Sequence, residues 1–417
     1  MPLTPPQCRG MNARLWVNRN FRLLFSSALA TNLGDGLIAV AIPWLATLLT
    51  SDPLLIGLVA AARHLPWALF ALHAGVLTDR HDHRRLILGA DTARLILSLA
   101  LMGLALTANP GTAPVLGLAA LAFLLGTAEV LRDNTAQTFL PDVVDKSQLE
   151  RANGALWAAE RLAGQLAGPP LAGFLIGLSV ALPFGMQTVL LLTALALIGA
   201  VRSASQPAPK AHQPALAAIR EGLGWLWHNP ILRRLALVSG AFNFVGYGFF
   251  TIFILYAQRV LNLDVVGYAT LLTLVACGGL AGSIFGPWVA LRIGPTASLL
   301  IGIGMFSASS AMLAAQAPLG VIAAFMLADA FCGMLWDITV VSYRQRHIPA
   351  PLLGRGNSAY RFIGTGPAAL GAFAFGALVS LLESPGDQTG ALLWPYAVAS
   401  GVTALLAIYA AFRLRLD

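Results

Sequence analysis

Residues 184–201 read FGMQTVLLLTALALIGAV, a run without Asp, Glu, Lys or Arg that stops at Arg202. An α-helix rises 1.5 Å per residue, so about 20 apolar residues cross the hydrocarbon core of a bilayer, which is about 30 Å thick. A charge-free run of this length is typical of a transmembrane helix. The stretch therefore predicts a membrane span that ends beside Arg202.

The same pattern extends over the whole chain. Of its 417 residues, 57% are hydrophobic and only 11% are charged, and the mean hydropathy is +0.74. Because a soluble domain carries about a quarter of its residues as Asp, Glu, Lys and Arg, this composition argues against a soluble enzyme. The apolar runs between charged residues and Pro or Gly breaks predict an all-α membrane protein with twelve transmembrane helices, over residues 21–48, 55–77, 86–107, 113–138, 153–178, 184–201, 231–257, 266–291, 296–315, 319–345, 358–382 and 392–412.

The basic residues indicate the orientation of these spans. Of the 26 Lys and Arg residues, 21 lie at the chain ends and in the loops of one side, and four lie inside spans. Only Arg259 belongs to the opposite set of loops, which are residues 49–54, 108–112, 179–183, 258–265, 316–318 and 383–391. Basic residues that flank spans stay in the cytoplasm, so both termini are predicted to be cytoplasmic. The net charge of +8 is then a topology signal and not a nucleic-acid-binding surface.

An internal repeat relates the two halves of the chain. Asn32 recurs as Asn243 and Glu129 recurs as Asp337, 211 and 208 positions later, each within a run of matching neighbours. Two parallel six-helix repeats with a site between them are a transporter architecture. The predicted organisation is a cytoplasmic segment 1–20, a six-helix bundle 21–201, a cytoplasmic linker 202–230, a pseudo-symmetric bundle 231–412 and a tail 413–417.

Several motifs carry a family resemblance over nearly the whole chain. The run Gly75-Val-Leu-Thr-Asp79-Arg80-His-Asp82-His-Arg84-Arg85 resembles the Gly-x-x-x-Asp-Arg signature between helices two and three of the major facilitator superfamily. Three further stretches, which are residues 19–22, 221–227 and 344–355, are similar to the branch of macrolide-efflux and enterobactin-type siderophore exporters. The resemblance implies a drug:proton antiporter that works by alternating access.

The loop signature predicts a conformational latch. A short turn with a carboxylate and several cations can pair with helix ends of the other half and hold one state closed, at up to about 1 kcal/mol per exposed contact. The alternative is plain positive-inside anchoring. The residues predicted to form the latch are Gly75, Asp79, Arg80, Arg84 and Arg85.

Helix five carries Gly164-x-x-x-Gly168-Pro169-x-x-Ala172-Gly173, which resembles a motif of proton-coupled exporters. Small residues allow helix backbones to approach closely, and Pro169 removes a backbone hydrogen bond and bends the helix. The alternative is ordinary helix packing without a role in transport.

Asp35 is the first candidate for proton coupling. It lies 14 residues into the first predicted span, about 21 Å along the helix, inside the run Gly34-Asp35-Gly36. A charged group near the bilayer centre costs about 2.5–3.5 kcal/mol or more, so it is expected to face water or a partner. No basic residue lies within one turn, and an unpaired carboxylate there suits proton binding and release; the alternative is simple exposure to water near the outer end.

Glu129 and its repeat partner Asp337 are the second candidates. They are predicted to line the central cavity and to suit a cationic substrate or proton handling. Arg132 and Asp133 share a helix face with Glu129, so a structural ion-pair cluster is the alternative. The residues predicted to line the substrate cavity are Asn32, Arg63, Arg132, Asp133, Asn243, Tyr247, Asp329 and Trp336.

These features predict a secondary active transporter that exports an amphiphilic organic solute (a drug, a macrolide-like compound or a siderophore) in exchange for protons. An importer or facilitator on the same fold and, more remotely, a non-transporting membrane sensor are the alternatives. The chain shows no G-x-x-x-x-G-K-[ST] nucleotide motif and no H-E-x-x-H or G-x-S-x-G motif, so an enzyme, a cofactor and a metal are not expected. We expect a monomer in a bacterial inner membrane, with lipid, protons and a small molecule as its partners.

Overall fold

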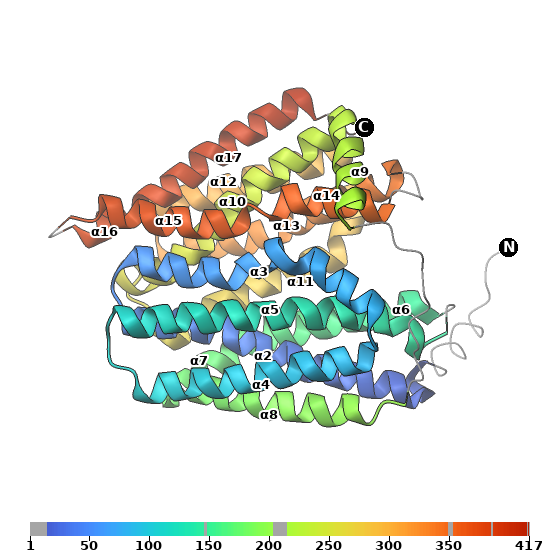
Figure 1. Ribbon diagram of the computed structural model, residues 1–417. Helices are drawn as coiled ribbons and strands as arrows, with labels where there is room; N and C mark the ends of the chain where they lie inside the picture. The colour runs from blue at the N-terminus through green and yellow to red at the C-terminus, as the bar shows by residue number, and fades with distance from the viewer. Residues whose placement is uncertain are drawn as a thin grey trace. The chain divides into compact units, whose positions relative to one another are not determined.

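The computed structural model describes residues 15–145, 148–202, 215–348, 353–384, 387–414 and 416. Within these ranges the chain is almost entirely helical, and the single β-bridge joins Ser384 and Asp387. Figure 1 shows long helices joined by short loops. The prediction of an all-α fold is confirmed.

The helices agree closely with the predicted spans. Their bounds are α2 Arg19–Leu49, α3 Pro53–Arg80, α4 His83–Thr107, α5 Thr112–Val143, α6 Leu149–Ala159, η2 Glu160–Ala167, α7 Gly168–Leu178, α8 Leu182–Gly199, α9 Ala215–His228, α10 Pro230–Arg259, α11 Val265–Ile293, α12 Pro295–Ala314, α13 Leu319–His347, α14 Leu353–Thr365, α15 Ala368–Leu382, α16 Gln388–Ala391 and α17 Leu393–Arg413.

Eleven stretches of the described chain are long and apolar enough to cross a membrane. The helix predicted over residues 153–178 completes the set, and it is built from three consecutive pieces, α6, η2 and α7. The twelve-helix membrane fold is therefore confirmed. The cytoplasmic placement of the two termini stays a prediction.

Polar side chains cap the first turns of two helices. The side chain of Asp82 accepts a hydrogen bond from the backbone N–H of Arg85 at the start of α4, at 2.8 Å. Asp264 caps α11 in the same way through Gly267, also at 2.8 Å. Such caps satisfy backbone donors that have no partner within the helix. Each of these two helices therefore begins directly after a short loop.

The middle of helix five departs from α-helical geometry. Glu160–Ala167 forms a π-helix, and the N–H of Gly168 bonds to the carbonyl of Ala163, five residues earlier. Pro169 and the proline after it follow this segment. Because proline has no N–H, the preceding carbonyls lose their α-helical donors, and a locally wider turn is one way to satisfy the backbone.

The helix-five glycines lie against the first helix. A Cβ atom added to Gly36 would fall 2.9 Å from the Cα of Gly168 and would also clash with the carbonyl of Gly164. Only glycine permits such a backbone approach. The close packing expected from this motif is present, and Pro169 and Gly173 are buried beside it.

The chain divides into two compact units, each discontinuous in sequence. The first comprises the described residues of Met1–Ile42, Leu69–Ala108 and Leu124–Ala211, and the second those of Pro43–Ala68, Asn109–Phe123 and His212–Asp417. Each has its own buried core, around Phe21 and Phe139 in the first unit and around Leu235 and Tyr360 in the second.

Candidate functional site

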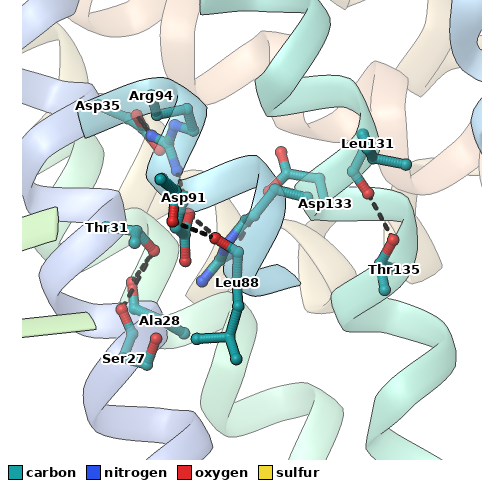
Figure 2. A network of polar contacts seen from close by, with 12 residues as sticks. Ser27, Ala28, Thr31, Asp35, Leu88, Asp91, Arg94, Leu131, Asp133 and Thr135 are labelled. Carbon is teal, nitrogen blue, oxygen red and sulfur yellow. Dashed lines mark hydrogen bonds and ion pairs between the residues drawn. The ribbon is translucent and has the colours of Figure 1, made fainter. Parts of the chain in front are cut away.

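Charged side chains from three helices meet inside the first unit. Asp35 comes from α2, Asp91 and Arg94 from α4, and Arg132 and Asp133 from α5. Figure 2 shows Asp35, Asp91 and Arg94 close together, with Asp133 on a neighbouring helix. Each of the five belongs to a predicted membrane span, where an ionised group is costly without a partner.

The five groups form a chain of alternating charge. The Arg94 guanidinium pairs with Asp35 through Nη2, and its Nη1 lies 3.3 Å from Asp91 Oδ1. The same Asp91 oxygen lies 3.8 Å from Nε of Arg132, whose Nη1 is 3.4 Å from Asp133 Oδ1. The order is acid, base, acid, base, acid, so every cation lies between two carboxylates.

The exposure of these side chains differs along the chain. Asp91, Arg94 and Arg132 are buried, whereas the side chain of Asp35 is 23% exposed and that of Asp133 is 33% exposed. Both ends of the charge chain are therefore partly exposed, while its centre is enclosed by the helices.

Glu129 adds a fourth carboxylate to the neighbourhood. Its charge acts on both Arg94 and Asp133. With Glu129 included, four acids face two arginines, which leaves a formal charge of −2. The predicted cluster of Glu129, Arg132 and Asp133 is thus present, but it is part of a larger network.

The expectation that Asp35 lacks a cationic partner is wrong. Its partner Arg94 lies 59 positions away on α4. Arg94 also pairs with Asp91, three residues earlier on the same helix. The sequence signal for this assembly was two opposite charges three residues apart in an apolar helix, because such a pair inside a membrane marks a helix face turned away from lipid.

The first unit also contains Asn32, one turn before Asp35. Asn32 is half-buried, and its carbonyl lies 3.2 Å from the position of a Cβ on Gly164. Asn32 therefore packs beside the helix-five glycines and lies three residues before Asp35 in the sequence. Its contact with substrate stays a prediction.

In the second unit, the residues predicted to line the substrate cavity differ in their contacts. Trp336 is buried and stacks on Phe242 with ring centroids 5.3 Å apart, so it belongs to the core. Asn243 donates hydrogen bonds to the carbonyls of Ser239 and Gly364, at 3.0 and 2.8 Å, which occupies its amide donors with backbone.

Tyr247 faces the segment that contains Arg63. The ring of His64 meets the Tyr247 ring edge to face, with centroids 4.7 Å apart. Arg63 and Tyr247 are both half-buried. These side chains bring residues of α3 and α10 together within the second unit.

Two carboxylates of α13 differ in their surroundings. Asp337 is exposed, and its charge acts on Tyr247 and Arg344. Asp329 lies ten residues into α13, about 15 Å from its start, and is half-buried. Within the described part of the chain, Asp329 makes no hydrogen bond or ion pair.

The predicted latch residues lie on two elements. The last turns of α3 contain Gly75, Asp79 and Arg80. The surroundings of these three residues lie outside what the structure describes. Arg84 donates through Nε to the carbonyl of Ile198 at 3.2 Å and also bonds to that of Gly199, at the C-terminal end of α8. A cation there satisfies unpaired carbonyls and the helix dipole, so Arg84 ties α4 to α8 within the first unit. The expected partner of Arg84, a helix end of the other half, is not the one observed. Arg85 contributes its backbone N–H to the Asp82 cap.

Among the described residues, no group of three or more His, Cys, Asp or Glu side chains is arranged to hold a metal ion. The charge chain with Glu129 contains more carboxylates than arginines, and two of these carboxylates, Asp35 and Asp133, are partly exposed.

Comparisons with known proteins connect this geometry to transport. A model of the Major Facilitator Superfamily matches residues 24–372. The chain is 28% identical over 319 residues to the multidrug efflux pump Tap of Mycobacterium tuberculosis, covering 72% of this chain and 73% of that protein. Its match to Tap of Mycolicibacterium fortuitum, at 29% identity, covers 52% of this chain and spans only 54% of that relative, about half its length.

The similarity also extends to a siderophore exporter and to solved structures. The chain is 23% identical over 393 residues to the enterobactin exporter EntS of Citrobacter koseri, covering 91% of this chain and 87% of that protein. The solved structure of the nucleoside transporter NupG, a D323A mutant, matches with a TM-score of 0.78 at 12% identity, covering 95% of this chain and all of that one. At this identity the match shows the fold.

Proposed function

The chain belongs to the Major Facilitator Superfamily and is a multi-pass membrane transporter, and from this premise we propose that it exports an amphiphilic organic solute in exchange for protons. The relatives named as efflux pumps and exporters support the outward direction. Transporters of this architecture alternate access by moving one bundle against the other. The proposed setting is a monomer in a bacterial inner membrane.

The proton part of the proposal is carried by one observation, the alternating charge chain with partly exposed carboxylates at its two ends. Asp35 is the proposed proton site, because it is a partly exposed end of the charge chain and its pairing with Arg94 joins α2 to α4. A proton on Asp35 removes its charge and weakens its attraction to Arg94. Arg94 is then held mainly by Asp91, so proton binding shifts the balance of pairing between α2 and α4.

Glu129 and Asp337 remain further proposed proton sites. Glu129 supplies one of the two excess negative charges of the cluster in the first unit. Asp337 is the exposed carboxylate on α13 in the second unit. Their relation by the sequence repeat supports parallel roles in the two halves.

Two motifs have proposed mechanical roles. The latch of Gly75, Asp79, Arg80, Arg84 and Arg85 is proposed to hold one conformation, with Arg84 anchoring α4 on α8. The helix-five motif is proposed to let α7 and η2 slide against α2, because the glycine contact between Gly36 and Gly168 has no side chains to interlock.

The test of the proposed function is transport in proteoliposomes that contain only this protein. We expect an imposed pH gradient to drive ethidium, a cationic amphiphile, against its concentration gradient, and we expect a matched release of protons that a pH-sensitive dye records. Ethidium movement that only follows its own gradient at every imposed pH would indicate a facilitator. The absence of movement for ethidium, erythromycin and enterobactin alike would favour the non-transporting alternative.

Asp329 provides a prediction about substrate charge. A carboxylate near the middle of a span, without an ion pair in the described chain, is suited to a cationic substrate. Asp329→Asn is expected to lower ethidium transport about tenfold, the loss of one charge-assisted contact, and to leave transport of neutral chloramphenicol unchanged. Asp329→Glu is the matched control and should retain ethidium transport. An equal loss for both compounds would assign Asp329 a structural role.

A further inference from the structure

Arg259 stands out because it is the lone basic residue in the six loops predicted to be non-cytoplasmic. It ends α10, and its guanidinium reaches two other loops. Nη1 donates to Glu383 Oε1 at 2.9 Å, directly after α15, and Nη2 donates to the carbonyl of Ser51 at 2.7 Å, between α2 and α3. One side chain thus ties together three of these loops.

Arg259 and Glu383 are held in a partly enclosed position. Their side chains are 18% and 19% exposed, so this pair is less screened by solvent than a surface ion pair. The planar guanidinium uses separate N–H groups for its two partners, which fixes the direction of both contacts. The arrangement is therefore a specific junction.

Two neighbouring contacts join the same segments. Gln258 donates through Nε2 to the hydroxyl of Thr47 on α2 at 3.0 Å. Further along, α3 and α15 meet at two glycines: a Cβ added to Gly57 would lie 3.0 Å from the Cα of Gly376. These residues all belong to the second compact unit, so chain from the first sequence repeat is packed onto helices of the second repeat.

We propose that Arg259, with Glu383 and the carbonyl of Ser51, is a lock that holds this end of the transporter closed and must release before the end opens outward. The glycine contact of α3 and α15 lets the helices approach but contains no polar pair that must break. The guanidinium contacts do have to break, and water can then solvate the separated charges. The lock rests on the chain being an alternating-access transporter and is independent of the coupled ion and of the substrate.

The test measures how often this end opens. In protein whose native cysteines Cys8, Cys277 and Cys332 are replaced by serine, His64→Cys supplies a reporter on α3 against Tyr247. Cells are treated from outside with a membrane-impermeant maleimide, without added substrate. The labelling rate of the reporter is proportional to the population that is open on this side.

Arg259→Gln is expected to raise the labelling rate about tenfold, the consequence of losing one hydrogen-bonded charge pair. Glu383→Gln should raise it in the same direction, and the exchanged pair Arg259→Glu with Glu383→Arg should lower it again toward the parent rate. The control is Arg292→Gln, which removes an exposed arginine that lies over the Trp288 ring at 4.0 Å. It should leave labelling unchanged.

A second variant changes the glycine contact between α3 and α15 and leaves every charge in place. Gly57→Ala puts a methyl group 3.0 Å from Gly376 Cα and 3.1 Å from the Ala372 carbonyl, so it should also raise labelling. Gly117→Ala, at a glycine with open space around it, is the matched control. Glu383→Gln, which breaks the same ion pair from its other side, keeps the test decisive if Arg259→Gln fails to fold.

Equal labelling rates for the parent, Arg259→Gln and Glu383→Gln would overturn the lock, and so would a rate that rises equally in Arg292→Gln. Because labelling needs neither a proton gradient nor a transported compound, this result is independent of the proteoliposome test. Loss of proton-driven ethidium transport with an intact effect of Arg259 on labelling would reject proton-coupled export and retain the lock.

Discussion

Proton-driven export falls below about one tenth of the parent rate when Asp35 is replaced by asparagine, because the amide that replaces the carboxyl group does not titrate. The asparagine side chain keeps the size of the original one and an oxygen that Arg94 can contact. The expected defect is therefore in coupling: ethidium still moves down its own gradient, but an imposed pH gradient no longer drives it. Proteoliposomes with a pH-sensitive dye measure both movements together.

Two comparisons make the Asp35 result specific. Asp264→Asn changes an acid that caps α11 in a loop, and it should leave coupling intact. Asp133→Asn removes the partly exposed acid at the other end of the charge chain. Normal proton stoichiometry in Asp35→Asn, together with its loss in Asp133→Asn, would move the proton site to the opposite end of the chain.

Arg94→Leu should destabilise the folded protein by about 3–5 kcal/mol, the cost of removing one partner from a buried ion pair. Asp91 and Arg94 have side chains that are 0% and 1% exposed, so solvent cannot replace the lost guanidinium. Asp91 keeps only Arg132 as an ion-pair partner within the described chain, at 3.8 Å. A lower yield of monodisperse protein and a lower unfolding temperature in detergent are the measurements.

The double variant Asp91→Leu with Arg94→Leu separates stability from coupling. Replacing both buried charges by apolar groups is often neutral or stabilising, so much of the lost stability should return. Proton-coupled export should not return, because Asp35 has lost its counter-ion. A single variant Arg94→Leu with parent stability would show that the buried pair has a negligible role in the fold.

The agreement between expected and observed helices has a simple cause. The bilayer requires about 20 apolar residues per helix and charged residues outside them, so run length and charge placement report each span directly. In helix five, run length and charge placement predict the span but not its local backbone geometry. Pro169 indicates a bend, but it does not predict that the backbone widens into a π-helix over Glu160–Ala167.

The sequence by itself determined the twelve-helix membrane fold, the repeat, the helix-five glycines and the presence of ionisable groups inside spans, because each of these follows from local composition and spacing. Only the tertiary structure decided which charges pair. Asp35 is 59 positions from Arg94, and Ser51 is 208 positions from Arg259. Ionic partners are chosen by distance in space, and the packing of helices sets that distance independently of separation along the chain.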